Sequence, residues 1–187
     1  DYTSMGRRIP DTRFIAFKTP LCHVYTEQCE HNKFDLEDLF GYCEHIGMIV
    51  DLTFTYRYYD RKLVEANYGA IHKKIGCGGH NVEEQEDKYL QFRDTVKEFL
   101  ESSSPDKLVG VHCTHGLNRT GYMVCRYLIE EEGWDAEGAI DAFDAARGHP
   151  MERENYKQHL IEKYKEVISS IQSHKEADEI QKEETQV

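Results

Sequence analysis

A cysteine and an arginine six positions apart are the residues of this chain best suited to chemistry. His112-Cys113 is followed by five residues and then by Arg119-Thr120. Across such a loop, a cysteine sulfur and a guanidinium can meet the same phosphate. The thiolate acts as a nucleophile and the planar guanidinium holds two oxygens. The spacing therefore predicts that Cys113 is a nucleophile for phosphoryl transfer and that Arg119 stabilises the phosphate in its ground and transition states.

The sequence on either side of this loop predicts a strand before it and a helix after it. Residues 108–111 are apolar and β-rich, whereas residues 119–132 carry apolar side chains at helical spacing and end at Gly133. Unsatisfied N–H groups and the dipole at a helix N-terminus favour negative charge. A thiol in such a position, beside a cation, has its pKa lowered from ~8.5 to roughly 3.5–7.5. Cys113 is therefore predicted to be a thiolate at neutral pH.

Other residues of the loop have narrower expected roles. Gly116 allows a tight turn, so that successive backbone amides can form a nest for an anion. Thr120 is expected to donate a hydrogen bond to the cysteine sulfur as it leaves, and His112 is expected to brace the loop rather than transfer a proton. The phosphate-binding residues are predicted to be Thr114, His115, Gly116, Leu117, Asn118 and Arg119.

Two of these assignments have plain alternatives. Asn118 is expected to fix the shape of the loop by hydrogen bonding, with substrate contact as the alternative. His115 is either a phosphate or RNA contact or an ordinary polar loop residue. For Cys113 itself the alternative is a buried structural cysteine, which the accompanying His, Gly, Arg and Thr disfavour. No second Cys or His lies at ligand spacing on the same turn, so neither a metal nor another cofactor is expected.

The motif from His112 to Thr120 resembles the signature of the cysteine-dependent phosphatases, the superfamily of protein-tyrosine and dual-specificity phosphatases. Inside the loop, residues 114–118 (Thr-His-Gly-Leu-Asn) resemble the RNA 5′-triphosphatase branch of that superfamily. Residues 13–21 and 49–59 are similar to the N-terminal signature of this branch and to its first core strand and loop.

The segment after the predicted helix 135–147 narrows the resemblance further. Residues 147–149 and 152–156 resemble the RNA-directed dual-specificity phosphatases rather than the capping-enzyme domains. This resemblance implies removal of the γ and β phosphates from 5′-triphosphorylated or diphosphorylated RNA, leaving a 5′-monophosphate. It also implies partners in RNA-processing or ribonucleoprotein complexes. By the same resemblance Arg153 would hold a phosphate beyond the one attacked, the alternative being a surface salt bridge with Glu152 or Glu154.

One departure from the superfamily bears on the substrate. Tyrosine phosphatases use an aspartate about thirty residues before the cysteine as general acid, but residues 78–86 contain no aspartate. Asp87 falls in a predicted helix, and Glu83 or Glu84 is the alternative acid. A phenol of pKa about 10 leaves better when protonated. A phosphate with a pKa near ~6 leaves as an anion. The sequence thus favours a phosphoanhydride substrate over phosphotyrosine.

Two other functions remain open at this stage. A dual-specificity protein phosphatase would use the same loop on phosphoproteins. A non-catalytic reader of RNA 5′-triphosphates, or an adaptor, would keep the pocket without turnover. The intact Cys113, Arg119 and Thr120 count against a non-catalytic role.

The charge of the chain limits how it could hold RNA. The formal net charge is −12, and residues 81–187 carry thirteen Lys and Arg against twenty-four Asp and Glu. An acidic chain is poorly suited to coat nucleic acid, so we expect a local grip on the 5′ end. Lys18 and Arg57 are candidate contacts at strand ends, with ordinary solvated charges as the alternative. Tyr58 and Tyr59 are expected to be core residues, with base stacking as the alternative.

The order of predicted elements indicates one α/β domain with a mostly parallel twisted sheet flanked by helices. We expect a phosphatase fold with its site at the carboxyl ends of the strands. Residues 1–172 would form the catalytic domain, and residues 173–187 a polar, acidic tail with a frayed helix or disorder. Strands are expected at residues 13–17, 48–54, 70–75 and 108–111, and helices at residues 35–46, 84–102, 119–132, 135–147 and from Pro150 onward.

The sequence carries no apolar run of membrane-spanning length and no signal-peptide pattern, so no membrane association is expected. A catalytic thiolate indicates a reducing compartment, the nucleus or the cytoplasm or both.

Overall fold

A five-stranded sheet forms the centre of the molecule, which is described by a computed structural model for all residues except 1, 23, 25–32 and 166–187. The strand order is β1-β2-β5-β3-β4. β1 pairs antiparallel with β2 at one edge, and every other pairing is parallel. The predicted α/β class with a mostly parallel sheet is confirmed. The strands are β1 (Met5–Arg8), β2 (Phe14–Lys18), β3 (Ile46–Asp51), β4 (Ile71–Lys74) and β5 (Leu108–Cys113).

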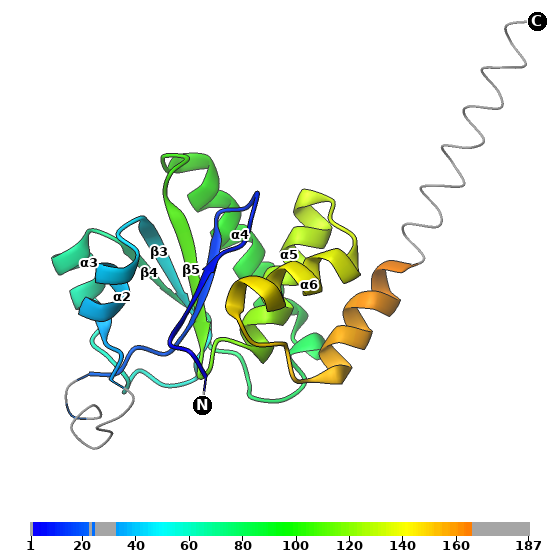
Figure 1. The fold of residues 1–187 in the computed structure, drawn as a ribbon, viewed down its shortest axis with the longest axis horizontal. Helices are drawn as coiled ribbons and strands as arrows, with labels where there is room; N and C mark the ends of the chain where they lie inside the picture. The colour runs from blue at the N-terminus through cyan, green and yellow to red at the C-terminus, as the bar shows by residue number, and fades with distance from the viewer. Residues whose placement is uncertain (1, 23, 25–32, 166–187) are drawn as a thin grey trace, which may run out of the picture.

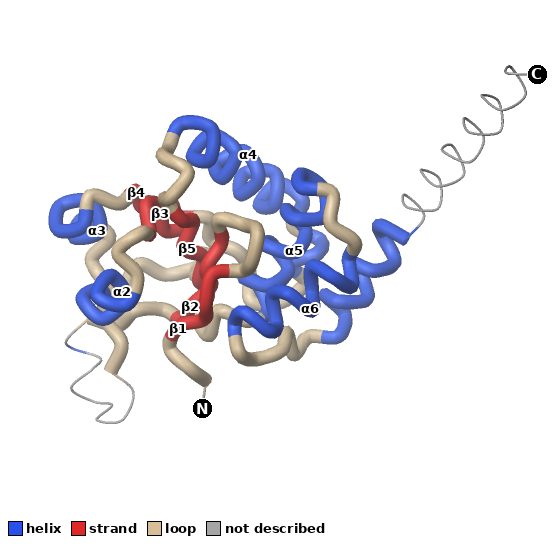
Figure 2. The backbone as a smooth tube through the Cα atoms, turned by 45° about the horizontal axis from the view of Figure 1, so that its top comes forward, coloured by secondary structure: helices blue, strands red, loops and turns tan. Residues whose placement is uncertain are grey.

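Helices cover both faces of the sheet, as Figures 1 and 2 show. α2 (Leu36–Tyr42) and α3 (Lys62–Tyr68) lie on one side. On the other side lie α4 (Glu86–Ser102), α5 (Asn118–Glu132), α6 (Ala136–Arg147) and the helical residues 154–165. A short 3₁₀ helix, η1 (Val82–Glu84), precedes α4. No helix in the described part of the chain is long and apolar enough to cross a membrane.

The strands alternate between two hydrophobic cores. In β2, Phe14 and Ala16 belong to the core under α4, α5 and α6, whereas Ile15 and Phe17 belong to the core under α2 and α3. Successive side chains of a strand point to opposite faces, so a sheet covered on both sides needs apolar residues at every position. This explains why the central strands are continuous apolar runs. The two cores hold the sheet in place, and the sheet positions the loop that follows β5.

The structure corrects several predicted boundaries. The helix that begins after Asp35 ends at Tyr42 rather than at residue 46, because Cys43 adopts an extended conformation and leads into β3. β3 ends at Asp51 rather than Phe54, since the Asp51 side chain accepts the Thr53 N–H at 2.8 Å and turns the chain away. The last helix begins at residue 154, so Pro150 lies in the loop before it. The predicted tail, residues 173–187, lies outside the described residues.

Candidate active site

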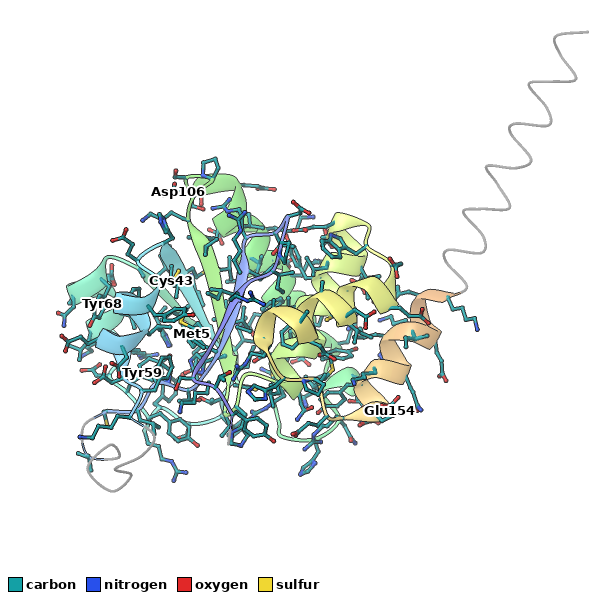
Figure 3. The ribbon with its side chains drawn as sticks, in the orientation of Figure 1. Met5, Cys43, Tyr59, Tyr68, Asp106 and Glu154 are labelled. Carbon is teal, nitrogen blue, oxygen red and sulfur yellow. The ribbon has the colours of Figure 1, made fainter. Side chains whose placement is uncertain are left out.

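The loop after β5 lies at the carboxyl ends of the parallel strands, as predicted for an open α/β sheet. Cys113 is the last residue of β5, and Asn118 is the first residue of α5. Lys18, at the end of β2, is the register partner of Cys113. In Figure 3, Tyr59 and Glu154 are labelled toward the end of the molecule that contains the carboxyl ends of the strands, and Asp106 is labelled at the other end.

Gly116 is required by the backbone of this loop. It adopts a left-handed conformation with φ of +67°, and a Cβ atom built on it would lie 2.1 Å from the carbonyl oxygen of Phe17. The loop is further tied to the strand-β2 side where the Thr19 N–H donates to the Thr114 carbonyl at 3.1 Å. The turn therefore packs directly against backbone, and only glycine fits it.

The electrostatics around Cys113 favour its thiolate. Burial raises the pKa of the thiol, but this is outweighed by the Arg119 charge and by hydrogen bonds from the Thr120 side chain and the Thr120 and Gly116 N–H groups. The net result is a pKa below the ordinary value for cysteine. These donors converge because Cys113 faces the N-terminus of α5, where backbone N–H groups lack helical partners.

The lowered pKa predicts a pH profile for alkylation. The rate of Cys113 modification by iodoacetamide should rise with pH through a midpoint below ~8.5, because the thiolate is the reactive form. Arg119→Met should move this midpoint upward, since it removes the cation beside the sulfur. Mass spectrometry of the peptide containing Cys113 reports the rate. A midpoint that does not move in this variant would contradict the assigned cause.

Arg119 is aimed into the pocket by three hydrogen bonds. Its Nη1 donates to the carbonyl oxygens of Leu52, at 3.2 Å, and Cys77, at 3.1 Å, and its Nη2 donates to Thr114 Oγ1 at 3.0 Å. A guanidinium has five N–H donors. Among the described residues these bonds leave the Nε–H and one Nη2–H without a partner. The side chain is therefore held in place before any ligand binds.

A second guanidinium lines the same pocket. The pocket has a volume of about 170 Å³ and is lined by Gly79, Cys113, Thr114, His115, Asn118, Arg119 and Arg153. Arg153 is positioned from both ends, since its backbone N–H donates to Asn118 Oδ1 at 2.9 Å and its Nη1 lies 3.1 Å from His80 Nδ1. Asn118 Oδ1 also accepts the N–H of Glu152 at 2.9 Å. Asn118 thus joins the phosphate loop to the segment that carries Arg153.

His112 is enclosed beneath the loop. Burial lowers its pKa to about 4, so the imidazole is neutral near pH 7. Its Nδ1 lies 3.2 Å from the carbonyl oxygen of Cys113, which can only accept, so Nδ1 carries the proton. Its Nε2 then accepts from the Tyr59 hydroxyl at 2.8 Å. Such an imidazole braces the loop.

An acidic residue supports this arrangement from β3. Burial opposes the ionisation of Asp51, but hydrogen bonds from Lys74 and Thr53 hold its pKa below the usual range. Lys74 Nζ donates to Asp51 Oδ2 at 2.9 Å. The carboxylate therefore stays charged and paired, and it anchors the ends of β3 and β4 behind the phosphate loop.

The Thr120 side chain faces the cysteine. It is completely buried, and its hydroxyl has no hydrogen-bond partner among the described residues. The Thr120 side chain contributes to lowering the pKa of the Cys113 thiol. A buried hydroxyl without a partner is costly unless it has a role, so Thr120 is a candidate for contact with a group that enters the site.

Sequence reasoning missed one residue that shapes the site. Arg147 is 1 % exposed, and its guanidinium donates to the carbonyl oxygens of Gly116 at 3.2 Å, His115 at 2.9 Å and Thr3 at 2.7 Å. Burial lowers its pKa to about 10, against the opposing effect of Cys113. In the sequence, a basic residue in the last turn of a helix is typical of a solvated C-cap. Nothing local distinguishes it from a brace of the phosphate loop.

Several candidates lie outside the described lining of the pocket. Lys18 has its Nζ 5.7 Å from the centre of the Phe34 ring, and Arg57 has its guanidinium 5.3 Å from the Tyr58 ring. Leu117 is buried in the core.

The acidic candidates also lie away from the sulfur. Glu83 Oε1 accepts from the Asn155 side chain at 2.7 Å, and Glu84 lies exposed in η1. No carboxylate lines the pocket among the described residues, and these contain no group of three or more His, Cys, Asp or Glu suited to a metal ion.

Comparison with known sequences identifies the family to which the chain belongs. Residues 43–166 match the model of the dual specificity phosphatase catalytic domain. The chain belongs to the dual specificity phosphatase family. It is 44% identical over 169 residues to the RNA/RNP complex-1-interacting phosphatase homolog of Caenorhabditis elegans, covering 86% of this chain and 72% of the relative. It is 45% identical over 166 residues to the human RNA/RNP complex-1-interacting phosphatase, covering 86% of this chain and 49% of that relative. The expected family is confirmed.

Other relatives have different names and lengths. A protein of Autographa californica nuclear polyhedrosis virus named tyrosine-protein phosphatase is 44% identical, with 86% of this chain and 95% of the relative covered. The chain spans about half the length of its mammalian relatives. Two solved structures share the fold. The active form of Tk-PTP superposes with a TM-score of 0.57 at 18% identity, covering 89% of this chain and 99% of that chain. The Cydia pomonella PTP-2 phosphatase superposes with a TM-score of 0.56 at 16% identity, covering 85% of this chain and 89% of that chain.

Proposed function

We propose that this phosphatase removes the γ and β phosphates from 5′-triphosphorylated RNA by a phosphocysteine mechanism, without a metal. The observation that carries the proposal is the pair of guanidinium groups, Arg119 and Arg153, in one pocket with the Cys113 thiolate. A single phosphate ester needs one such group beside the nucleophile. A polyphosphate chain presents a second anionic group farther from the point of attack, which suits Arg153.

The chemistry follows from the positions of these groups. The Cys113 thiolate attacks the terminal phosphorus, a sulfur–phosphorus bond forms, and the bond to the bridging oxygen breaks with its electron pair remaining on that oxygen. Arg119 and the loop amides stabilise the equatorial oxygens. The leaving group is the shortened RNA phosphate, whose pKa near ~6 lets it depart as an anion without a general acid. This fits a pocket whose described lining has no carboxylate.

The second half of the reaction frees the enzyme. Water attacks the phosphocysteine, its oxygen bonds to phosphorus, and the sulfur leaves as a thiolate with inorganic phosphate as the product. The Thr120 hydroxyl, which has no other hydrogen-bond partner among the described residues, donates to the departing sulfur and stabilises it. Repetition on the diphosphorylated product yields a 5′-monophosphate.

Two further assignments belong to this proposal. The names of the worm and mammalian relatives refer to an RNA/RNP complex, and we extend association with ribonucleoprotein or RNA-processing complexes to this chain. A thiolate nucleophile functions in a reducing compartment, the nucleus or the cytoplasm.

A protein phosphatase is the second candidate. It is favoured by relatives named as tyrosine-protein phosphatases, which are 38% and 44% identical to this chain. A kcat/KM that is higher for phosphopeptides than for triphosphorylated RNA would support it. The non-catalytic reader is a third, and single-turnover release of phosphate would exclude it.

The experiment uses a short 5′-triphosphorylated RNA labelled separately at the γ and β positions, with EDTA present. We expect release of both labels and accumulation of monophosphorylated RNA. Release of the γ label alone would restrict the activity to a triphosphatase of the capping type. If neither label is released by a preparation that hydrolyses an aryl phosphate, RNA is not the substrate.

A further inference from the structure

Two large aromatic side chains are exposed in the loop that follows β3. Phe54 is 79% exposed and Tyr56 is 61% exposed. The sequence placed Phe54 in a strand, where it would be buried, but β3 ends at Asp51. Two exposed rings in one short loop are unusual for a surface that only meets water, because each leaves apolar area unburied.

This loop starts at a residue that holds the catalytic arginine. Arg119 Nη1 donates to the carbonyl oxygen of Leu52, and Phe54 follows two residues later, within about 7 Å of chain. The Phe54 ring also borders the other segment that Arg119 contacts. A Cβ built on Gly76 would lie 3.7 Å from Phe54 Cδ2, and the next residue, Cys77, accepts from Arg119 at 3.1 Å. Phe54 therefore lies close to the two backbone carbonyl groups that anchor Arg119.

The Tyr56 ring is flanked by two cations. Lys74 Nζ and the Arg61 guanidinium each lie 4.8 Å from its centroid. Lys74 is fixed by Asp51 Oδ2 at 2.9 Å and by the Thr55 carbonyl at 2.6 Å. A hollow of about 430 Å³ opens beside this ring, with a lining of Cys22, Tyr56, Arg57, Tyr59, Asp60 and Arg61. The ring is thus held in position by two cations, and Asp60 also lines the hollow beside it.

Tyr58 and Tyr59, the stacking candidates of the sequence, are less exposed than Phe54 and Tyr56. Tyr59 is only 8 % exposed, and its hydroxyl contacts His112 and His72. Tyr58 is half-buried against the core under α2 and α3. The rings available to a ligand in this loop are those of Phe54 and Tyr56.

We propose that Phe54 and Tyr56 form a stacking platform for the first bases of the RNA whose 5′ phosphates occupy the pocket. The proposal rests on the proposed function and specifies how the substrate beyond its phosphates is recognised. Aromatic faces stack on any base, so recognition tolerates sequence, and Arg57 and Arg61 supply local charge for the phosphodiester backbone. This gives an acidic chain a confined RNA-binding surface instead of a long groove.

The test compares two substrates that share the reacting phosphates. Wild type, Phe54→Ala and Tyr56→Ala are assayed on a 5′-triphosphorylated RNA trinucleotide and on inorganic tripolyphosphate, which has no base. We expect KM for the RNA to rise about tenfold in each variant, in the range measured for single base–aromatic stacks. The kinetics on tripolyphosphate should not change. Tyr56→Phe keeps the ring and should keep the wild-type KM.

Tyr42→Ala is the matched control, because Tyr42 is a 66% exposed tyrosine at the end of α2. It should leave KM for the RNA unchanged. Equal losses on both substrates would overturn the platform, since they would mean that the rings only shape the catalytic loop. So would an unchanged KM for the RNA in the Phe54 and Tyr56 variants. Failure of the wild type to release phosphate from the RNA would instead defeat the proposed function.

Discussion

Cys113→Ser should lower kcat for phosphate release by about three orders of magnitude or more, as replacement of a covalent nucleophile does in other enzymes. The charges that lower the pKa of the Cys113 thiol cannot ionise a serine hydroxyl at neutral pH, so the variant lacks the attacking anion. Substrate binding should persist, because the Arg119 side chain is held by Leu52, Cys77 and Thr114 rather than by the sulfur. Single-turnover kinetics and an equilibrium titration with triphosphorylated RNA measure the two quantities separately.

Cys43→Ser is the control for this experiment. Cys43 is a half-buried cysteine at the end of α2, on the side of the sheet away from α5. Its replacement should leave kcat within about twofold of wild type. A Cys113→Ser enzyme that turns over near the wild-type rate would contradict the phosphocysteine intermediate.

The fold was predictable wherever a signal is local. Asp35 forms a capping box with Asp38, and Asp135 accepts the Gly138 N–H at 2.7 Å, so both predicted helix starts are confirmed. Gly133 ends α5 in the left-handed conformation that its position indicated. The predicted strands at residues 13–17 and 70–75 agree with β2 and β4 within a residue or two.

The errors came where tertiary contacts decide the outcome. β1 is a short edge strand that pairs with β2 alone among the described strands, and its sequence carries a glycine and two arginines rather than an apolar run. That glycine, Gly6, is there because a Cβ would lie 2.9 Å from the backbone of α6. Such a constraint involves residues 140 positions away in the sequence, so no local pattern contains it.

The site likewise contains residues that the local sequence predicts and a residue whose role depends on tertiary contacts. The loop from Cys113 to Arg119 is contiguous, so its spacing sufficed to predict that one pocket would contain both ends. Asn118 was expected to shape the loop, and its Oδ1 accepts the N–H groups of Glu152 and Arg153, a partner segment that the local sequence does not indicate. Arg147 escaped notice because burial gives it its role, and burial of a charged residue is not visible in the sequence.

Gly116→Ala should lower kcat/KM by about a hundredfold or more, because a displacement of roughly 1 Å in a catalytic loop has that effect. The new Cβ would lie 2.1 Å from the Phe17 carbonyl oxygen, whereas ordinary van der Waals contact needs at least 3.4 Å. Either the loop or β2 must move, and β2 is held in the sheet on both sides by β1 and β5. The loop that carries the amides and Arg119 is the part that yields.

Gly133→Ala separates this clash from the cost of the backbone conformation. Gly133 also has a positive φ, +74°, but a Cβ there would meet nothing within 4 Å. The control should lose only about 1–2 kcal/mol of stability, the cost of a left-handed conformation for a residue with a side chain, and it should keep its kcat/KM. Thermal unfolding and kcat/KM are measured for both variants at a temperature where both remain folded. If Gly116→Ala retains kcat/KM within threefold, close packing of the loop against Phe17 does not hold the catalytic groups in place.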